Sequence, residues 1–541
     1  MVPLFSPLFP MKLRSLKPIS RASLGLLSLV MAGSALRAGE FTYSLPSASE
    51  VNWEDEGFWT NGDGVPYGPG IYPDAGDTIA GLNSQVSGQV TNLYLGGNRT
   101  VARLEGSELT GARLLSGSTG TANLQNSLTI TEAFDVKAGA FYLRSQEGGR
   151  LTVTTPTLLV GSTEFETPDR IRVELGTTNA AHGNVSFTSQ ETVFQSYLSR
   201  FVLASAFDTA KGYVSLGHVT FDTNTGFNSG VTLTANTGGT NATIYVASLT
   251  STAASTEGRF QGNGTVVIDP GTSTAAAPAV ANFGRAISGG LRIEKEGDSL
   301  QIFSFDRPDS STESNLYTGG TAINGGVLAV RNTQGSGLGT GAVSVASGGT
   351  LAGSGRIALG TGNAITVASG GVVAPGEDNR LLVAGGHEAL TRQTLTLHRT
   401  ALHMESGSSF AFRLSADGSS DRLAFTNYQN GSLILDGGEI TINVSGDLQA
   451  GQTYTLFTFT DANGNAISSG LTGGLVTGDG FGESMVSFHY DNPLHGGIGT
   501  ITMTVAPIPE PGAALLLLPV AAGALYWRGR RRGREATSNL I

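Results

Sequence analysis

Short runs in which apolar and polar residues alternate extend over most of this 541-residue chain. Such runs lie at 127–130, 150–154 and 230–234, and glycine, asparagine, serine and threonine separate them. Alternation with a period of two places every second side chain on one face of a β-strand, whereas the 3.6-residue period of a helix is scarce here. The pattern predicts an all-β protein. A weak helical pattern at 191–204 marks the one segment that is a candidate for a helix outside the sheets.

The stretch 317–376 repeats itself. Three of its segments align without gaps, at 322–329, 345–352 and 367–374. Their Gly-Gly pairs, which begin at Gly325, Gly348 and Gly370, are 23 and then 22 residues apart. A period of this size indicates one supersecondary unit per repeat. One rung cannot bury its apolar face alone, so we predict a β-solenoid in which each repeat is a rung that stacks on its neighbours.

Aromatic residues and prolines distinguish the region 39–81. It contains Trp53, Phe58, Trp59, Tyr67 and Tyr72, with Pro66, Pro69 and Pro73 between them. Glycines and prolines at this density favour turns over helix. We predict an N-terminal capping region that closes the first open end of the solenoid. The alternative is an exposed aromatic platform that binds carbohydrate together with the nearby carboxylates.

The alternating runs become longer beyond residue 381. They lie at 393–398, 409–414, 439–444 and 454–459. Such runs suit either the last rungs or an antiparallel sheet that caps the second end, and we expect a mixture of the two in a C-terminal β-rich module at 381–506. The segment 82–380 is then the β-helix itself.

Charge and composition narrow the functional classes. Removing the five positive charges of residues 1–38 and the net three of the tail from Glu510 onward leaves a formal charge of −19 on residues 39–509. A body this acidic argues against nucleic acid as a partner. The chain has no cysteine, which excludes disulfides, thiolate zinc sites and cysteine nucleophiles. At 39% hydrophobic residues it is too apolar to be disordered.

The N-terminus has the features of an export signal. Basic residues at Lys12, Arg14, Lys17 and Arg21 precede an apolar run at 24–32 and then a group of small residues. The apolar run is too short to span a bilayer, so we predict a signal peptide at 1–38 that signal peptidase removes. Cleavage is expected after Ala38, with Ala35 as the alternative. Either Met1 or Met11 could be the start.

The C-terminus combines three features in the segment 507–541. A Pro-Glu-Pro tripeptide (Pro509, Glu510, Pro511) precedes an apolar run at 512–527, and a basic cluster follows it. The cluster contains Arg528, Arg530, Arg531 and Arg532. As a helix the apolar run would be about 24 Å long, which predicts a short transmembrane helix. The arginines should remain cytoplasmic, so the body lies outside the membrane.

This order of Pro-Glu-Pro, apolar helix and arginines resembles the PEP-CTERM sorting signal. The resemblance implies that an exosortase-type enzyme recognises the tail at the inner membrane and passes the body to the envelope, the cell surface or the exterior.

The repeat region at 315–376 resembles a second family, the autotransporter-associated β-strand repeat. The matching segments are 317–321, 325–328, 338–343, 347–355 and 374–376. The resemblance implies a right-handed parallel β-helix in a surface or secreted protein. A self-translocating autotransporter is disfavoured, because its C-terminus would form many alternating barrel strands rather than an arginine cluster.

Residues that carry chemistry are dispersed. The seven histidines are scattered, and the acidic groups at 54–56 and 294–298 are those expected of solvated turns. The stretch 461–465 resembles a calcium loop but lacks its spaced bidentate glutamate, so a turn is the better account. No nucleophile elbow or phosphate-binding loop is present. We expect no catalytic residue, no cofactor and no metal site.

Together these features predict an exported cell-surface or extracellular β-solenoid with a structural or adhesive role. Its expected partners are the exosortase-type enzyme, signal peptidase, the inner membrane and an extracellular polysaccharide, but not nucleic acid. The alternative is a surface polysaccharide-active β-helix enzyme, a lyase or a hydrolase, with shallow carboxylates.

Overall fold

A computed structural model of the chain describes most of residues 40–506. The gaps are 46–49, 56–57, 62, 64, 85–90, 107–111, 117–123, 138–139, 146–148, 162–170, 177–184, 196–198, 204–212, 223–229, 234–241, 252–258, 272–279, 307–314, 377–392, 430, 437–439, 447, 472–473, 479–485 and 491–498. The predicted signal helix at 1–38 and the predicted transmembrane helix at 512–527 lie outside the described residues.

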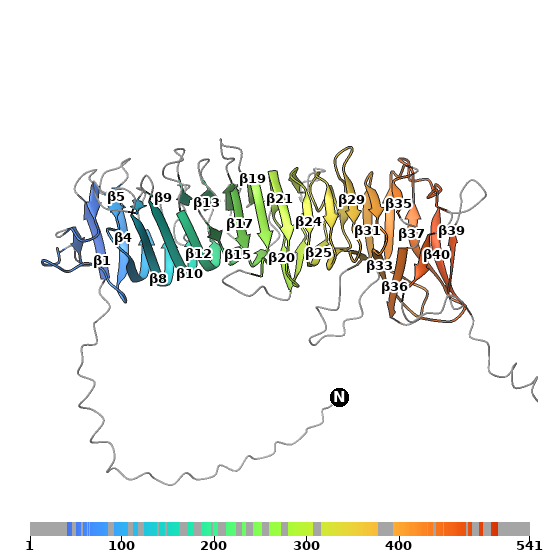
Figure 1. The fold of residues 1–541 in the computed structure, drawn as a ribbon, viewed down its shortest axis with the longest axis horizontal. Coiled ribbons are helices and arrows are strands. Elements are labelled where there is room, and N and C mark those ends of the chain that lie inside the picture. Colours follow the sequence, from blue (N-terminus) through green and yellow to red (C-terminus); the bar gives the residue numbers. More distant parts are fainter. Residues whose placement is uncertain are drawn as a thin grey trace, which may run out of the picture.

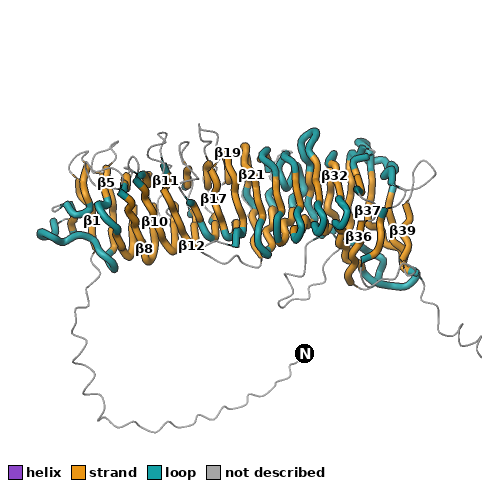
Figure 2. Tube along the Cα trace, in the orientation of Figure 1, coloured by secondary structure: helices purple, strands orange, loops and turns teal. Residues whose placement is uncertain are grey.

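The described residues form strands and no helix, so the prediction of an all-β protein is confirmed. The strands stack along one long axis, from the N-terminal blue end to the C-terminal red end (Figure 1). Strands make up most of the body, and loops lie mainly at its edges and ends (Figure 2). The helical candidate at 191–204 is wrong. Its described residues form the end of β12 (Val185–Phe194) and the whole of β13 (Arg200–Leu203), because pairing with the neighbouring rungs on both sides satisfies their backbone groups.

The pairings trace three columns of parallel strands, and each turn of the chain adds to them in the order column 2, column 1, column 3. Column 1 contains β14 (Val214–Ser215), β17 (Ala242–Val246), β24 (Thr321–Ile323), β26 (Val343–Val345), β29 (Ala364–Val367), β32 (Ala401–Met404) and β35 (Leu433–Leu435). Column 2 contains β2 (Glu50–Asn52), β5 (Thr91–Tyr94), β7 (Ala112–Leu115), β9 (Ala140–Arg144), β11 (Arg172–Leu175), β13, β16 (Gly230–Leu233), β23 (Leu316–Tyr317), β28 (Arg356–Ile357), β31 (Thr394–His398), β34 (Arg422–Thr426) and β37 (Thr453–Phe459).

Column 3 runs along the remaining side. It contains β1 (Glu40–Leu45), β4 (Thr78–Ser84), β15 (His218–Phe221), β18 (Ser248–Ser251), β20 (Val280–Phe283), β22 (Leu300–Phe303), β25 (Gly326–Val330), β27 (Gly349–Gly353), β30 (Val372–Pro375), β33 (Ser409–Leu414), β36 (Ile440–Gly446) and β38 (Leu475–Thr477). Six long strands bend from one column into the next: β6 (Arg99–Gly106), β8 (Gln125–Val136), β10 (Arg150–Val160), β12, β19 (Arg259–Ile268) and β21 (Ala286–Lys295). Long parallel columns of this kind are consistent with a β-solenoid.

The sequence repeat has the period of one rung. In column 1, Thr321 of β24 pairs with Val343 and Val343 pairs with Ile365, a step of 22 residues each time. In column 3, Val327 of β25 pairs with Thr350, which pairs with Val372, in steps of 23 and 22. The prediction that one repeat forms one rung is therefore confirmed.

The Gly-Gly pairs lie at the corner between columns 1 and 3. Gly348 and Gly370 have φ values of +82° and +80°, a backbone conformation that side chains with a Cβ rarely adopt. The following Gly349 lies so close to the Ile323 carbonyl of the preceding rung that a Cβ would collide with it. At the corner of Gly348 and Gly349, one glycine is thus required for its backbone angle and the next for close stacking; in the first pair the left-handed residue is Gly326, with a φ of +58°.

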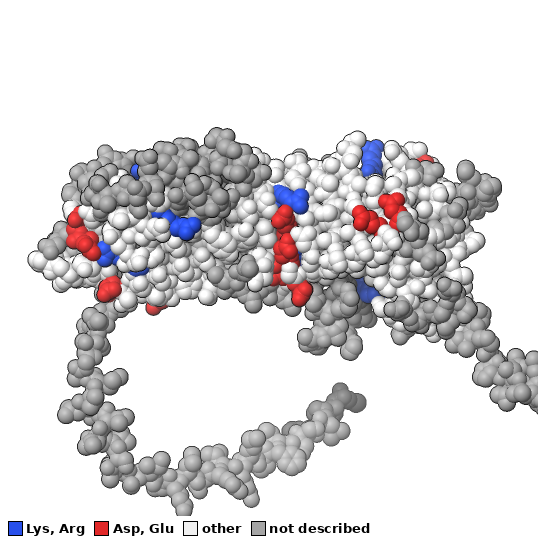
Figure 3. Space-filling view, in the orientation of Figure 1, with Lys and Arg blue, Asp and Glu red and all other residues white. Residues whose placement is uncertain are grey.

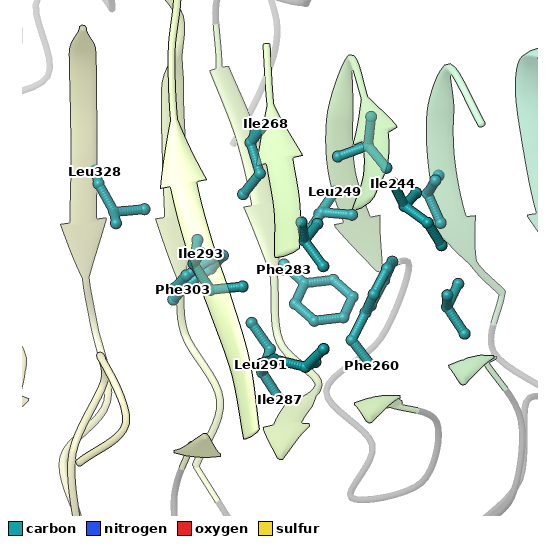
Figure 4. Close-up of a cluster of buried hydrophobic side chains, with 14 of the residues drawn as sticks. Ile244, Leu249, Phe260, Ile268, Phe283, Ile287, Leu291, Ile293, Phe303 and Leu328 are labelled. Carbon is teal, nitrogen blue, oxygen red and sulfur yellow. The ribbon is translucent and has the colours of Figure 1, made fainter. Parts of the chain in front are cut away.

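The core fills the space between the columns. In β10 the alternate residues Leu151 and Val153 are buried, as the alternating pattern predicts. Further along, Phe260 and Phe283 point into the interior with aliphatic side chains from neighbouring rungs (Figure 4). Phe221 packs against both rings, with centroids 5.9 Å and 5.4 Å away, and those two rings are 6.0 Å from each other. Each such buried side chain contributes about 1.5–3 kcal/mol of transfer free energy, so the stack is held together by one continuous apolar core.

Aromatic side chains are buried and packed together at the N-terminal end of the stack. Strand β1 pairs antiparallel with β3 (Trp59–Thr60) and parallel with β4. Trp53 and Trp59 are 0% and 1% exposed, and their ring centroids are 5.3 Å apart. The Trp53 indole donates to the Pro73 carbonyl at 3.1 Å, and that of Trp59 to the Trp53 carbonyl at 2.8 Å. These two indoles are therefore unavailable for the carbohydrate platform considered as the alternative.

Both kinds of pairing occur in the described part of 381–506. Parallel pairing continues through β33, β36 and β38 in column 3 and through β31, β34 and β37 in column 2. Strand β40 (Thr500–Val505) then pairs antiparallel with β37 and with β39 (Val486–Tyr490). The last strands thus cover the edge that column 2 would otherwise leave open.

Candidate functional site

The residues predicted to direct export lie outside the described part of the chain. These are Ala38 at the expected cleavage site, Pro509, Glu510 and Pro511 of the sorting motif, and Arg528, Arg530, Arg531 and Arg532 of the basic cluster. Within the residues that the structure describes, no helix is long and apolar enough to cross a bilayer.

Two histidines of the described body contact hydroxyl groups on the next rung. The Nδ1 atoms of His218 and His398 each lie 3.0 Å from a hydroxyl on the next rung, that of Ser248 and of Thr426 respectively. Burial, followed by nearby arginines, lowers the pKa of His398. His182, His387 and His495 lie outside the described residues. Each of these two contacts joins one rung to the next.

The carboxylates singled out in the sequence are taken up by local partners. Glu54 lies 2.6 Å from the Arg99 guanidinium, and Glu294 lies 2.6 Å from that of Arg292. In the 461–465 stretch, backbone N–H groups of Asn463 and Asn465 donate to Asp461, each at 2.8 Å. A hydrogen bond from the Asn465 side chain, followed by these backbone bonds, lowers the pKa of Asp461. Among the described residues, no group of three or more metal-ligating side chains is placed to hold an ion.

Among the residues that the structure describes, charged side chains are sparse on the face shown in Figure 3, and the largest acidic group there lies over the middle of the stack. Elsewhere, on the outer side of column 3, Arg103, Glu105, Asp135 and Lys137 form a four-charge network. Arg103 lies 2.5 Å from Glu105 and 2.8 Å from Asp135, and Lys137 lies 3.0 Å from Glu105. Two cations balance two anions, and their ion pairs join one rung to the next.

A polar pocket of about 590 Å³ lies at the corner between columns 2 and 1, on the rungs of β29, β32 and β34. Its lining residues with polar side chains are Thr361, Asn363, Arg399, Thr400, His403, Thr426, Asn427, Tyr428, Gln429 and Ser432. The lining offers one imidazole, one guanidinium, amides and hydroxyls, and contains no carboxylate. This volume is within the range of small-ligand sites.

Two residues of the pocket have unusual backbone angles. Arg399 and Asn427 have φ values of +52° and +50°, and they occupy successive rungs, since the Arg399 N–H donates to the Thr426 carbonyl at 3.0 Å. With the Asn427 amide turned so that its oxygen faces Arg399, that oxygen accepts from the Nε and Nη2 atoms of Arg399. Left-handed residues cost free energy, and the stacking of one such corner on the next stabilises both here.

A cationic surface on column 2 was not anticipated from the sequence. We define the arginine patch as Arg113 of β7, Tyr142 and Arg144 of β9, and Arg172 and Glu174 of β11. The guanidinium carbons of Arg113, Arg144 and Arg172 lie 5.9, 5.0 and 5.2 Å from the centre of the Tyr142 ring. Arg172 also donates to the Tyr142 hydroxyl at 2.6 Å.

The single carboxylate of the patch does not balance its three cations. Glu174 lies 3.4 Å from Arg172 and 3.9 Å from Arg144, and Arg113 donates instead to the neutral Asn92 side chain at 3.0 Å. Finding the patch in the sequence would have required the rung period of this region, where Arg113 pairs with Tyr142 and Tyr142 with Glu174 at steps of 29 and 32 residues. Because this period is irregular, the sequence alone did not reveal the arginine patch.

Comparison with known proteins adds no relative, since no family model matches the chain and a search of curated proteins found no match.

Proposed function

We propose that this chain is an exported β-solenoid with a structural or adhesive role at the cell surface or outside the cell, sorted through a PEP-CTERM and exosortase-type system. The observation that carries the proposal is the order of Pro509, Glu510 and Pro511, the apolar run 512–527 and the arginine cluster in the tail. A positively charged signal with an apolar core at the other end supports it. Before processing, the chain is held in the inner membrane by its C-terminal helix.

The proposed fold is a right-handed parallel β-helix. Three columns of parallel strands support it, because parallel strands joined by crossover connections are almost always right-handed. A body of this kind suits a scaffold. Its stability grows by the addition of similar rungs, and it offers a long, rigid outer surface.

The test of sorting is a deletion of Pro509–Pro511 in a tagged chain expressed in its native host. The expected result is an unprocessed chain that stays in the inner-membrane fraction, while the wild-type chain is processed and reaches the envelope or the medium. The matched control deletes Thr537–Asn539, also three residues of the tail, and should be delivered normally. Unchanged processing and delivery of the Pro-Glu-Pro deletion would sink the sorting proposal.

The competing proposal is a polysaccharide-active β-helix enzyme. The observation that favours it is the polar pocket, which contains His403 as a potential general base and Arg399 as a cation. The full chain would be incubated with acidic and neutral polysaccharides, with and without calcium, and new chain ends would be measured. Turnover that His403→Gln abolishes, while the folded control His218→Gln retains it, would replace the scaffold proposal with an enzyme.

A further inference from the structure

We propose that the arginine patch of column 2 binds the carboxylates of a carboxylated polysaccharide. This rests on the proposed function in one respect, because only an exported chain would meet such a polymer outside the cell. The binding itself is a property of the body and does not depend on the sorting signal.

The first argument is the excess of cations among the patch residues. Three guanidiniums surround one tyrosine ring, and Glu174 is the only carboxylate among the patch residues. Like charges on adjacent strands repel each other, so an anion that bridges them would lower the free energy of this surface. The net positive charge of the patch residues contrasts with the formal charge of −19 on residues 39–509.

The second argument is the state of the guanidiniums. The side chains of Arg144 and Arg172 are 19% and 31% exposed, so each is partly desolvated but still reachable. Burial and then the proximity of Arg113 lower the pKa of Arg144, which shows that its charge is held at some cost. A partly desolvated guanidinium binds a carboxylate more strongly than a fully hydrated one, and its planar fork can donate two parallel hydrogen bonds.

The third argument is the geometry of the guanidiniums. Consecutive rungs of a parallel sheet lie about 4.8 Å apart, and Arg113, Arg144 and Arg172 lie on three successive rungs. In the strand register Arg113 lies opposite Tyr142, whereas Arg144 is two residues beyond that ring and Arg172 lies opposite Ala140, two residues before it. The three cations therefore converge on one ring from three rungs. The sheet holds them in place before any ligand arrives, which reduces the entropy lost on binding. A polyuronate, with one carboxylate per sugar, presents a carboxylate to this cluster.

A nucleic acid fits this patch less well. Duplex DNA carries a charge about every 1.7 Å of its axis, so the acidic body around the patch repels it strongly. Carboxylated polysaccharide is therefore the class to which the observations point.

The test measures equilibrium binding of the full chain, purified in mild detergent, to fluorescent oligogalacturonate. The comparison ligands are the same oligomer with its carboxylates reduced to alcohols, dextran and single-stranded DNA. We expect binding to oligogalacturonate alone, weaker at 1 M salt than at 0.15 M because the screening length falls from about 8 Å to about 3 Å. Arg144→Ala and Arg172→Ala should each weaken it by about tenfold, as expected for the loss of a charge-assisted hydrogen bond.

Two further variants make the result decisive. Arg422→Ala, an exposed arginine on β34 of the same column, should bind like wild type. Arg172→Lys keeps the charge but loses the fork, and should bind with intermediate affinity; thermal melting confirms that each variant is folded. Any one of four results would overturn the proposal. The first two are equal binding of the carboxyl-reduced oligomer and tighter binding of DNA. The other two are absence of binding by the folded wild-type chain and wild-type affinity in the folded Arg144→Ala/Arg172→Ala variant. The tail deletion measures where the chain is delivered, so none of these binding results decides the sorting proposal.

Discussion

Lys295 shows how much one buried charge can depend on its immediate neighbours. Its side chain is fully buried at the end of β21, with Nζ 3.4 Å from the Asp269 carboxylate and 3.1 Å from the Gly297 carbonyl. The Glu296 carbonyl accepts from it as well. Burial lowers the pKa of Lys295, and Asp269 offsets only part of that effect. A charge paired and hydrogen-bonded in this way is tolerated in a core, but it is not a source of much stability.

This residue predicts a pH dependence of stability. Because the folded-state pKa of Lys295 lies below its ordinary value of 10.5, the unfolded chain binds more protons between those two pKa values. The free energy of unfolding therefore rises as pH increases through that alkaline window and levels off above about 10.5. Denaturant unfolding of wild type and Lys295→Met, measured from about pH 8 to pH 11, should differ in slope by this contribution. Parallel curves for the two proteins would contradict the assignment.

At the scale of the element, the Gly-Gly corner explains why the repeat is so regular. Residue Gly348 supplies a left-handed backbone angle, whereas Gly349 provides room for the Ile323 carbonyl of the rung before it. The two glycines have different roles, so substituting each should destabilise the fold for a different reason and by a different amount.

We predict that Gly349→Ala destabilises the fold by about 1–3 kcal/mol, because the added Cβ meets backbone that cannot rotate away. Gly348→Ala should cost about 1–2 kcal/mol through its backbone angle alone, since nothing lies within 4 Å of its Cβ position. Thermal melting followed by circular dichroism measures both. Gly68→Ala is the control, because Gly68 has open space and no left-handed angle, and it should leave the melting temperature unchanged. A Gly349→Ala protein as stable as this control would refute the stacking account.

At the scale of the whole molecule, the three columns make the body nearly one-dimensional. Each rung pairs with the one before and the one after, so stability is close to a sum of rung and interface terms. Where two successive rungs contain the same number of residues between paired positions, one rung should be removable without disturbing the register of the rest.

The chain offers one such place. Deleting 343–364 moves Ile365 into the position of Val343 opposite Thr321, and moves Val372 into that of Thr350 opposite Val327. We expect a soluble protein with an unchanged β-sheet circular dichroism spectrum and a slightly lower melting temperature. Deleting only 343–353 removes β26 and β27, about half the residues of a rung, so the strands that follow no longer reach their own columns. That protein should fail to fold. Equal behaviour of the two deletions would argue against independent rungs.

Sequence and structure agree where the signal is local and regular. Alternation identified the strands, and the repeated glycines predicted the rung, because both express a steric requirement that recurs within about two dozen residues. The helical candidate at 191–204 failed for the opposite reason. Its weak local pattern was overridden by pairing of Val193 with Leu159 on one side and with Thr220 on the other.

By itself, the sequence determined the all-β class, the rung period at 317–376 and the expected export and sorting signals at the two ends, since each depends on residues close together in the chain. Only the tertiary structure brought Arg113, Tyr142 and Arg172 together, and only it formed the pocket that contains Arg399 and His403. The physical reason is that contacts between rungs depend on the number of residues in each turn. Loops change that number from rung to rung, so the neighbours across a column are decided by how the whole stack closes.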